Sequence, residues 1–488
     1  MRRAVIRAVS WTLLDSLGKN LLLFAFTVVL ARLLTPADFG VVAMLSLFTG
    51  IASALAEGGL GSALVQTQEP SKEEVSTVFW AQALLGSMLG LALAVSGPLL
   101  ANWFSQPLIA ALAIAYGVNI FISALGSIHT TLFMKRLQFR TPTLIAFAAQ
   151  IVAGGAAVFA AVVHAGAWAI IVQAITASAL TTTLLWVFSP WRPSLVFSMA
   201  ALRKFAGSGA YTVGTGVLAE VELRIGSIAV GRFSGPVDTG LFQRASSLQL
   251  FLSRLLSGVV TRVAFPAFAA VQNEPKRLGN AIREAAFVNF AATAMIMWTV
   301  AIIAEPLIRL VFGPAWNPSA PVLRALCLAA GFYPVYAVFA KALKATGQFR
   351  VVFIQQAIRA AGMTAAAFAF AASGFVAVAW AQSIFLIASL AIGSTAIARS
   401  ASYPLRSQLA DLSPIAFAGA TMGAAGLALV IRMKDAPDLT RVLAVGATCV
   451  ITYIATLAVL TAILRMEAAR LAWCTLSSFF RGPSHGKV

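Results

Sequence analysis

Long apolar stretches separated by short polar breaks run through almost the whole chain, and they restrict its possible folds more than any other feature. Of the 488 residues, 60% are hydrophobic and only 10% are charged, whereas soluble domains carry about a quarter charged residues. Fourteen stretches are each long enough to cross the roughly 30 Å of bilayer hydrocarbon as a helix. They cover residues 9–32, 40–66, 76–101, 107–134, 141–163, 166–188, 206–230, 241–271, 284–308, 319–345, 350–371, 374–397, 412–431 and 441–464.

These stretches predict an all-α polytopic membrane protein with about 14 transmembrane helices. Inside lipid every backbone N–H and C=O must be paired within its own segment, so helices are expected and open strands are not. The longest internal break is residues 189–205. Because it carries Trp191 and Phe197 followed by Arg203, we expect it to form an interfacial helix.

The net charge of +19 is distributed as a membrane topology requires. With the N-terminus in the cytoplasm, about 21 of the 35 Lys and Arg fall on the cytoplasmic side and about seven outside, which is the positive-inside bias. The basic residues therefore indicate orientation and not nucleic-acid binding, and both termini are predicted to be cytoplasmic. No cofactor is expected, because Cys327, Cys449 and Cys474 lack metal or disulfide spacing and residues 207–216 lack the phosphate-loop pattern.

One turn is written twice. The stretch "TPADFG" at 35–40 is answered by "GPVDTG" at 235–240, and seven of the 23 positions from 36 to 58 are identical to those 200 residues later. Two further matches follow in the same order: "VQTQEPSK" at 65–72 with "VQNEPKR" at 271–277, and "QFR" at 138–140 with "QFR" at 348–350. The chain is therefore expected to contain an internal repeat.

Each copy of the repeat holds six predicted helices. An even number of crossings returns the chain to its starting side, so the copies share one orientation and are related by an axis along the membrane normal, as in parallel-repeat transporters. The predicted parts are a six-helix lobe at 1–188, a cytoplasmic linker at 189–205, a second six-helix lobe at 206–397, two extra transmembrane helices at 398–464 and a basic cytoplasmic tail at 465–488.

The residues "LLTPADFGVVAMLSLFTGIASALAEGGLGSALVQ", followed by "STVFWAQALLG", closely resemble the start of the bacterial Wzx-type polysaccharide flippases. These belong to the multidrug/oligosaccharidyl-lipid/polysaccharide exporter superfamily. The resemblance is sharpest over residues 9–105 and extends through the helix layout. It implies a multi-pass protein of the bacterial inner membrane with two lobes around a central cavity. It also implies transport of undecaprenyl-pyrophosphate-linked oligosaccharides to the periplasmic leaflet, with lipid as surroundings and no enzymatic activity.

Charged side chains inside the predicted spans are costly in lipid and indicate a wet cavity or a partner. Lys and Arg in such a cavity suit a pyrophosphate, because Arg forms a bidentate fork with its oxygens and Lys supplies a point charge. The family places spans one, two, seven and eight around its cavity, and Arg359 in span eleven has no acid within one turn. The predicted substrate-binding residues are Lys19, Arg224, Arg254, Arg262 and Arg359.

Four acids complete the candidate site, and two interpretations of them stay open. Asp15, Glu57, Glu220 and Glu222 either bind a coupling ion or balance the cations. Asp15–Lys19 and Glu220–Arg224 are each four residues apart on one helix face, so each pair either neutralises itself or contributes to the cavity.

Alternatives to a flippase also remain. A cation-coupled small-molecule exporter of the same superfamily is the principal one, although the excess of Lys and Arg over acids favours an anionic substrate. A membrane enzyme of glycan assembly is weaker, since no Ser/His/Asp set is recognisable. The basic tail either lies on the inner leaflet alone or also contacts a polysaccharide polymerase or export complex.

Overall fold

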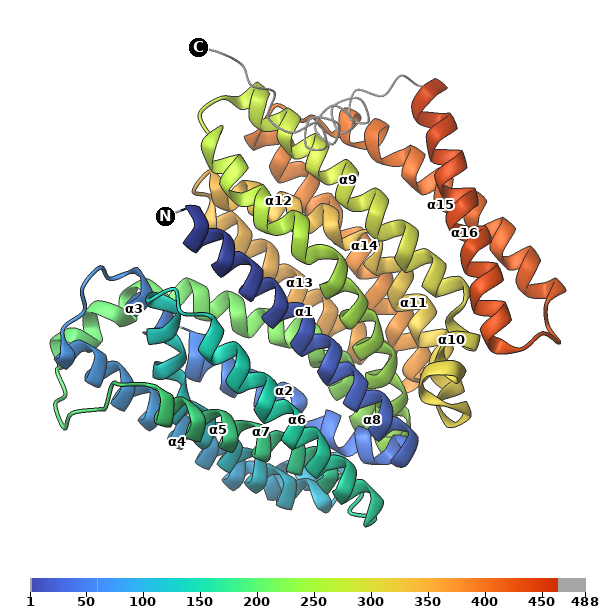
Figure 1. Cartoon of the computed structure of the whole chain (residues 1–488). Helices are drawn as coiled ribbons and strands as arrows, with labels where there is room; N and C mark the ends of the chain where they lie inside the picture. The colour runs from blue at the N-terminus through green and yellow to red at the C-terminus, as the bar shows by residue number, and fades with distance from the viewer. Residues whose placement is uncertain (1, 59, 464–488) are drawn as a thin grey trace. The chain divides into compact units, whose positions relative to one another are not determined.

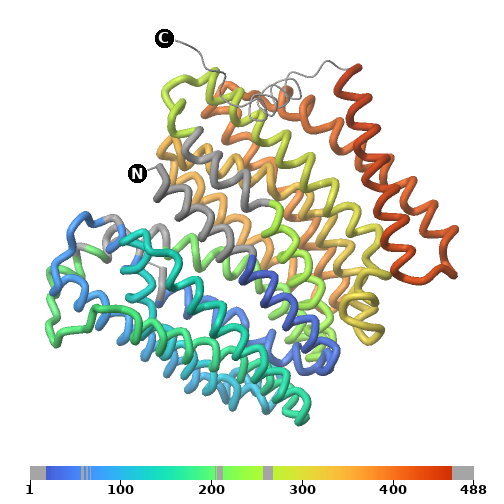
Figure 2. The backbone as a smooth tube through the Cα atoms, viewed as in Figure 1, coloured from blue at the N-terminus to red at the C-terminus, as the bar shows by residue number. Residues whose placement is uncertain are grey.

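The computed structural model describes residues 2–58 and 60–463 (Figure 1). Within them, the side chains of residues 2–17, 57, 58, 62, 63, 66, 204, 206–212 and 257–267 lie outside the description (Figure 2). The described residues form helices joined by short turns and contain no strand, which confirms the predicted all-α fold.

The helices follow one another along the described chain as labelled in Figure 1. Their bounds are α1 Arg2–Leu33, α2 Pro36–Gly58, α3 Leu60–Gln66, α4 Lys72–Phe104, α5 Leu108–Lys135, α6 Arg140–Val162, α7 Trp168–Phe188, α8 Met199–Ala270, α9 Pro275–Ile302, α10 Ala304–Phe312, α11 Ala320–Ala330, α12 Tyr333–Ala345, α13 Phe349–Phe370, α14 Phe375–Ser400, α15 Leu405–Arg432 and α16 Asp438–Ile463, with short 3-10 helices at Pro314–Ser319 and Ala371–Ser373.

The predicted spans coincide with these helices. The second stretch is divided between α2 and α3, the ninth between α9 and α10, and the tenth between α11 and α12, while the seventh and eighth both lie in α8. Among the described residues, ten helices are long and apolar enough to cross a membrane, and an eleventh span results if the pair Pro314–Ala330 and Tyr333–Ala345, bent by 40°, is one broken span. A count of about 14 is consistent with this arrangement.

α8 is interrupted at the second copy of the repeated turn. Gly235 has φ 83° and ψ −173°, a backbone conformation that residues with a Cβ rarely adopt, and Pro236 after it has no N–H to donate. The Thr239 hydroxyl donates to the Gly235 carbonyl at 2.7 Å. The predicted boundary between the seventh and eighth spans therefore lies at Gly235.

The prediction of an interfacial helix over the linker 189–205 is wrong for residues 189–198, which are not helical, whereas residues 199–205 form the beginning of α8. Pro190 and Pro193 remove two backbone donors from this segment, and each restricts the residue before it to extended conformations. The segment is bound to α4 instead: the Trp80 indole Nε1 donates to the Ser194 carbonyl at 2.9 Å. Residues 189–198 thus form a non-helical segment that lies along the start of α4.

The chain divides into two compact units, and each is described by itself. The first unit is Met1–Gln243 with Ala367–Phe375, and the second is Arg244–Ala366 with Val376–Val488. In the first unit α4 packs along α5, α6 along α7, and α1 along α6. In the second unit α9 packs against α11, α12 and α15, and α15 runs beside α16 (Figure 1). The predicted lobe boundaries stay a prediction.

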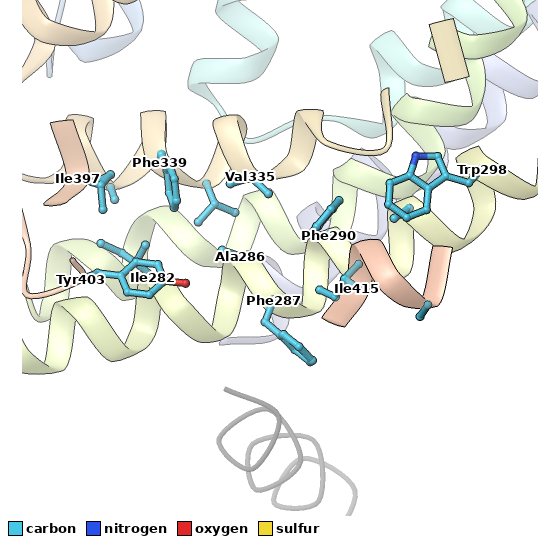
Figure 3. Close-up of a cluster of buried hydrophobic side chains, with 14 of the residues drawn as sticks. Ile282, Ala286, Phe287, Phe290, Trp298, Val335, Phe339, Ile397, Tyr403 and Ile415 are labelled. Atoms are coloured by element: carbon cyan, nitrogen blue, oxygen red, sulfur yellow. The ribbon is translucent and has the colours of Figure 1, made fainter. Parts of the chain in front are cut away.

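The core of the second unit is built on one face of α9. Phe290 and Trp298 lie eight residues apart on this helix with ring centroids 5.9 Å apart, and Phe339 of α12 lies over the same helix (Figure 3). The Trp298 indole donates to the Leu328 carbonyl at 2.9 Å. Ile415 of α15 is fully buried in this cluster, so the first of the two extra helices is an integral part of the core.

Candidate functional site

Glu220 and Arg224 of α8 form the ion pair that their spacing predicts. Arg224 Nε lies 2.5 Å from Glu220 Oε2, and the two side chains are 29% and 27% exposed in the order Arg, Glu. A partly exposed pair of this kind contributes little to stability, typically about 0–1 kcal/mol in water. An anionic ligand of Arg224 would have to compete with the Glu220 carboxylate, and whether the pair also contributes to a cavity stays a prediction.

Gly50 of α2 lies directly against this ion pair. A Cβ at position 50 would overlap Glu220 Oε2 and would lie 2.8 Å from Arg224 Nε. Two helices that are far apart in sequence, α2 and the first part of α8, therefore approach each other at the charged pair. Because Gly50 has no side chain, the ion pair can occupy the space beside its Cα.

Arg254 and Arg359, both in the second unit, have contrasting surroundings. Arg254 of α8 is exposed. Arg359 of α13 is 2% exposed, and its guanidinium lies 3.8 Å from the ring centroid of Tyr336 on α12. The Tyr336 hydroxyl donates to Gln356 Oε1 at 3.1 Å. Arg359 therefore joins α12 to α13 through a cation–π contact, and contact with a substrate would require it to leave this position.

The other predicted site residues are placed less completely. Lys19 and Glu222 are partly buried in the first unit, and both have further interactions there. The side chains of Asp15, Glu57 and Arg262 lie outside the described residues. The shared cationic cavity therefore stays a prediction.

The two copies of the repeated turn meet each other within the first unit. A Cβ on Gly40 would overlap the Pro236 carbonyl oxygen, and a Cβ on Gly240 would overlap the Pro36 carbonyl oxygen. The contact is reciprocal, as expected for two equivalent elements related by a two-fold axis. Residues that the sequence identified only as a repeat are thus brought into direct backbone contact.

The capping of these turns differs between the copies. Thr35 donates to Asp38 Oδ2 through its backbone N–H at 2.9 Å and through its hydroxyl at 2.7 Å. In the second copy the residue at the Thr35 position is Gly235, which has no hydroxyl. Burial raises the pKa of the Asp238 carboxyl above its ordinary value, because the charged form loses water.

A charged network in the second unit was not predicted from the sequence. Arg283 of α9 forms two hydrogen bonds to Asp411 of α15, from Nε to Oδ2 at 2.5 Å and from Nη2 to Oδ1 at 2.7 Å. The Tyr403 hydroxyl donates to the same carboxylate at 3.1 Å, and burial, followed by the negative charge of Asp411, raises the pKa of this phenol. The partners lie 128 residues apart, so no spacing rule could have joined them.

The sequence also gave no sign of a hollow of about 730 Å³ in the first unit. It lies between α3, α5 and α7 and is lined largely by serine, threonine and small residues. Hydroxyl residues are common in membrane helices, where they bond to their own backbone, so their presence alone does not indicate a cavity.

Comparisons with known proteins agree with this architecture. A family model described as polysaccharide biosynthesis protein matches residues 29–321. The chain is 27% identical over 364 residues to the succinoglycan biosynthesis transport protein ExoT of Rhizobium meliloti (strain 1021), covering 75% of this chain and 74% of that protein. It is 26% identical over 310 residues to the lipopolysaccharide biosynthesis protein WzxC of Escherichia coli (strain K12), covering 62% and 61% of the two.

The fold is similar to that of a solved transporter. The lipid II flippase MurJ in an inward closed conformation matches with a TM-score of 0.76 at 16% identity, covering 94% of this chain and 100% of that chain. The family model spans more than half of this chain, and the resemblance of residues 9–105 to Wzx-type flippases points the same way. The chain is therefore a multi-pass membrane protein that belongs to the polysaccharide biosynthesis protein family.

Proposed function

We propose that this chain is a flippase that moves undecaprenyl-pyrophosphate-linked oligosaccharide repeat units from the cytoplasmic to the periplasmic leaflet of the inner membrane. The units would serve export of a surface or secreted polysaccharide. Membership of the polysaccharide biosynthesis family supports this substrate class, and one relative carries the name of a succinoglycan biosynthesis transport protein. The excess of Lys and Arg on one side supports an orientation with both termini in the cytoplasm.

The reciprocal contact between Gly40 and Gly240 is the observation that carries the mechanism. In the proposed orientation the turn after α1 lies on the periplasmic side. In this proposal the two turns separate when that side opens, as rocking of two repeats requires for alternating access. Closely packed surfaces such as these two turns favour two discrete states, in contact or apart, over a continuous range of positions.

The cations would hold the pyrophosphate during this movement. Arg254 is exposed, so it can form a bidentate contact with phosphate oxygens without first breaking a buried contact. Lys19, Arg224, Arg262 and Arg359 are proposed to act with it, Arg224 by exchanging the Glu220 carboxylate for phosphate. The sugars would cross in the wet cavity, while the polyprenyl chain stays in lipid.

The test uses a host strain in which the gene is deleted. We expect loss of the polysaccharide and accumulation of its undecaprenyl-pyrophosphate-linked repeat unit on the cytoplasmic side, both reversed by the wild-type gene. Arg254→Ala should fail to reverse them. Arg277→Ala is the matched control, because this arginine is 72% exposed at the start of α9, outside the predicted spans.

Other results would change the proposal in defined ways. Rescue by Arg254→Ala as complete as rescue by Arg277→Ala would remove Arg254 from the substrate site and leave the flippase in place. Intact polysaccharide without accumulation, together with altered sensitivity to cationic drugs, would favour the cation-coupled small-molecule exporter.

A further inference from the structure

The hollow between α3, α5 and α7 has the volume of a ligand site, and its wall carries hydroxyl groups among apolar side chains. Its volume of about 730 Å³ falls within the roughly 300–1,000 Å³ of ligand pockets. Seven hydroxyl side chains line it, and among its described lining residues none is charged or aromatic. All of these residues belong to the first unit.

Part of this hydroxyl set holds the helices together. Ser123 Oγ of α5 donates to Ser178 Oγ of α7 at 3.1 Å, and Thr182 Oγ1 donates to the Ile122 carbonyl at 3.0 Å. These contacts cross directly between the two helices. They join α5 to α7 beside the hollow.

Two threonines on the wall of the hollow do not take part in hydrogen bonds of this kind among the described residues. Thr130 of α5 and Thr181 of α7 both line the hollow and are partly exposed, and neither hydroxyl forms a hydrogen bond to a described residue. Their neighbour Thr131 does bond to the Ser127 carbonyl, at 3.1 Å. A hydroxyl at membrane depth is costly unless it meets a partner or water. Thr130 and Thr181 are therefore available to a ligand or to water.

The residues that line the hollow favour the sugar portion of the proposed substrate over its pyrophosphate. A pyrophosphate needs cations, and the described residues that line the hollow include none. Lys135, at the end of α5, donates to the carbonyls of Leu64 and Thr67. An apolar or aromatic drug would leave the hydroxyls of Thr130 and Thr181 without partners. Sugar hydroxyls both donate and accept, as serine and threonine hydroxyls do, so they can satisfy this wall.

We propose that this hollow is a saccharide subsite, in which Thr130 and Thr181 bind hydroxyls of the oligosaccharide repeat unit. This inference rests on the proposed function, because it assigns the sugar portion of that substrate to a wall within one unit. In the proposed orientation the ends of α5 and α7 that line the hollow lie toward the cytoplasm, where the lipid-linked unit is presented. In this proposal the hollow binds the sugar hydroxyls of the substrate, and the cations bind its pyrophosphate.

The experiment measures binding to the purified full chain in lipid nanodiscs. The probe is the free oligosaccharide repeat unit, released by depolymerisation of the host's own polysaccharide and followed by calorimetry. We expect the Thr130→Val/Thr181→Val variant to bind about tenfold or more weakly than wild type, since two hydrogen bonds of ~1 kcal/mol each are lost. Thr395→Val is the matched control, because this exposed threonine of α14 bonds only locally, to the Ile392 carbonyl.

A conservative variant separates recognition from misfolding. Thr181→Ser keeps the hydroxyl and should bind within about twofold of wild type, while Thr181→Val should not. Equal binding by wild type and the double valine variant would overturn the proposal. So would equal affinity for glycerol, which carries the hydroxyl chemistry of lipid headgroups without a sugar ring, or an equal loss of inorganic pyrophosphate binding in the valine variant.

The assay also keeps the two proposals apart. Hydroxyl-dependent binding of the oligosaccharide, combined with a deletion strain that accumulates no lipid-linked unit, would retain the subsite and remove the flippase. Accumulation in the deletion strain without hydroxyl-dependent binding would retain the flippase and remove the subsite.

Discussion

Gly40 and Gly240 hold equivalent places in the two copies of a repeated turn, and each packs against the backbone of the other copy. A Cβ on Gly40 would overlap the Pro236 carbonyl oxygen and lie 3.0 Å from the backbone nitrogen of Gly240. A Cβ on Gly240 would overlap the Pro36 carbonyl oxygen and lie 3.2 Å from the nitrogen of Gly40. The obstacle is backbone in both directions, so neither side can yield by a rotamer change.

A methyl group at either position should separate the two turns. We expect Gly40→Ala and Gly240→Ala each to lower the free energy of unfolding by about 1–3 kcal/mol, the usual cost of overpacking, and to impair rescue of polysaccharide export. Thermal unfolding of the purified protein and complementation of the deletion strain measure the two effects.

Gly155 of α6 supplies the control for these substitutions. A Cβ there meets nothing within 4 Å, so Gly155→Ala should leave export unchanged and stabilise the helix by up to ~1 kcal/mol. If Gly40→Ala behaves like Gly155→Ala in both assays, the backbone contact has no role in transport.

The repeat was predictable because its turns are encoded locally. Gln138 and Gln348, which begin the two "QFR" matches, each donate a backbone N–H to the carbonyl five residues earlier, at 3.0 and 2.8 Å. Each follows a residue with positive φ, Leu137 at 54° and Gly347 at 78°. The same short sequence thus forms the same turn in both copies. The extended linker does not follow from Trp191 and Arg203, which indicate an interface; it follows from Pro190 and Pro193, which remove backbone donors that a helix needs.

The candidate site was predictable only where partners share a helix. The Glu220–Arg224 pair follows from a spacing of four, whereas the contact of Arg359 with Tyr336 depends on how α12 packs on α13. The hollow depends on the distance between α5 and α7, which no single segment encodes. Contacts between helices require the fold, and the sequence of one chain does not supply them.

Enlarging Gly50 should displace the Glu220–Arg224 pair without unfolding the protein. The atoms in the way are the ends of two flexible side chains, which can move at low cost. We therefore expect Gly50→Ala to change the transport rate more than the unfolding temperature. Complementation and thermal unfolding of the same variant provide the comparison.

A double substitution tests the cause of that effect. Glu220→Ala removes the carboxylate that a Cβ at position 50 would overlap, so Gly50→Ala should have little further effect in its presence. Additive effects of the two substitutions would mean that Gly50 acts on another neighbour.

Removing the Asp411 charge should strongly destabilise the second unit. The Asp411 side chain is 3% exposed and that of Arg283 is 17% exposed, so Asp411→Asn removes a buried carboxylate charge to which Arg283 donates two hydrogen bonds. We expect a loss of about 3–5 kcal/mol in the free energy of unfolding, measured by denaturant or heat in detergent. The exposed pair Arg277–Glu274 is the control, and Glu274→Gln should cost less than about 1 kcal/mol. Equal effects at the two pairs would contradict this assignment.

The ring of Tyr336 should stabilise the buried Arg359 independently of the Tyr336 hydroxyl. Tyr336→Phe keeps the ring 3.8 Å from the guanidinium and loses only the hydrogen bond to Gln356, so we expect a cost of about 1 kcal/mol. Tyr336→Leu removes the ring as well and should cost about 2 kcal/mol more. Thermal unfolding ranks the three proteins, and equal stability of the Phe and Leu variants would show that the cation–π contact contributes nothing.

Asp38 and Asp238, equivalent in the repeat, should respond oppositely to loss of charge. Burial raises the pKa of Asp238 above 3.8, so the folded chain holds that proton more tightly than the unfolded chain, and stability falls as pH rises through this window. Asp238→Asn should therefore unfold at a higher temperature than wild type at pH 7, with the difference shrinking toward pH 4. Asp38→Asn should unfold at a lower temperature, because the Asp38 carboxylate accepts two hydrogen bonds from Thr35. Thermal unfolding of the two variants and the wild type between pH 4 and pH 7 measures these differences. A lower unfolding temperature of Asp238→Asn at pH 7 would contradict the desolvation argument.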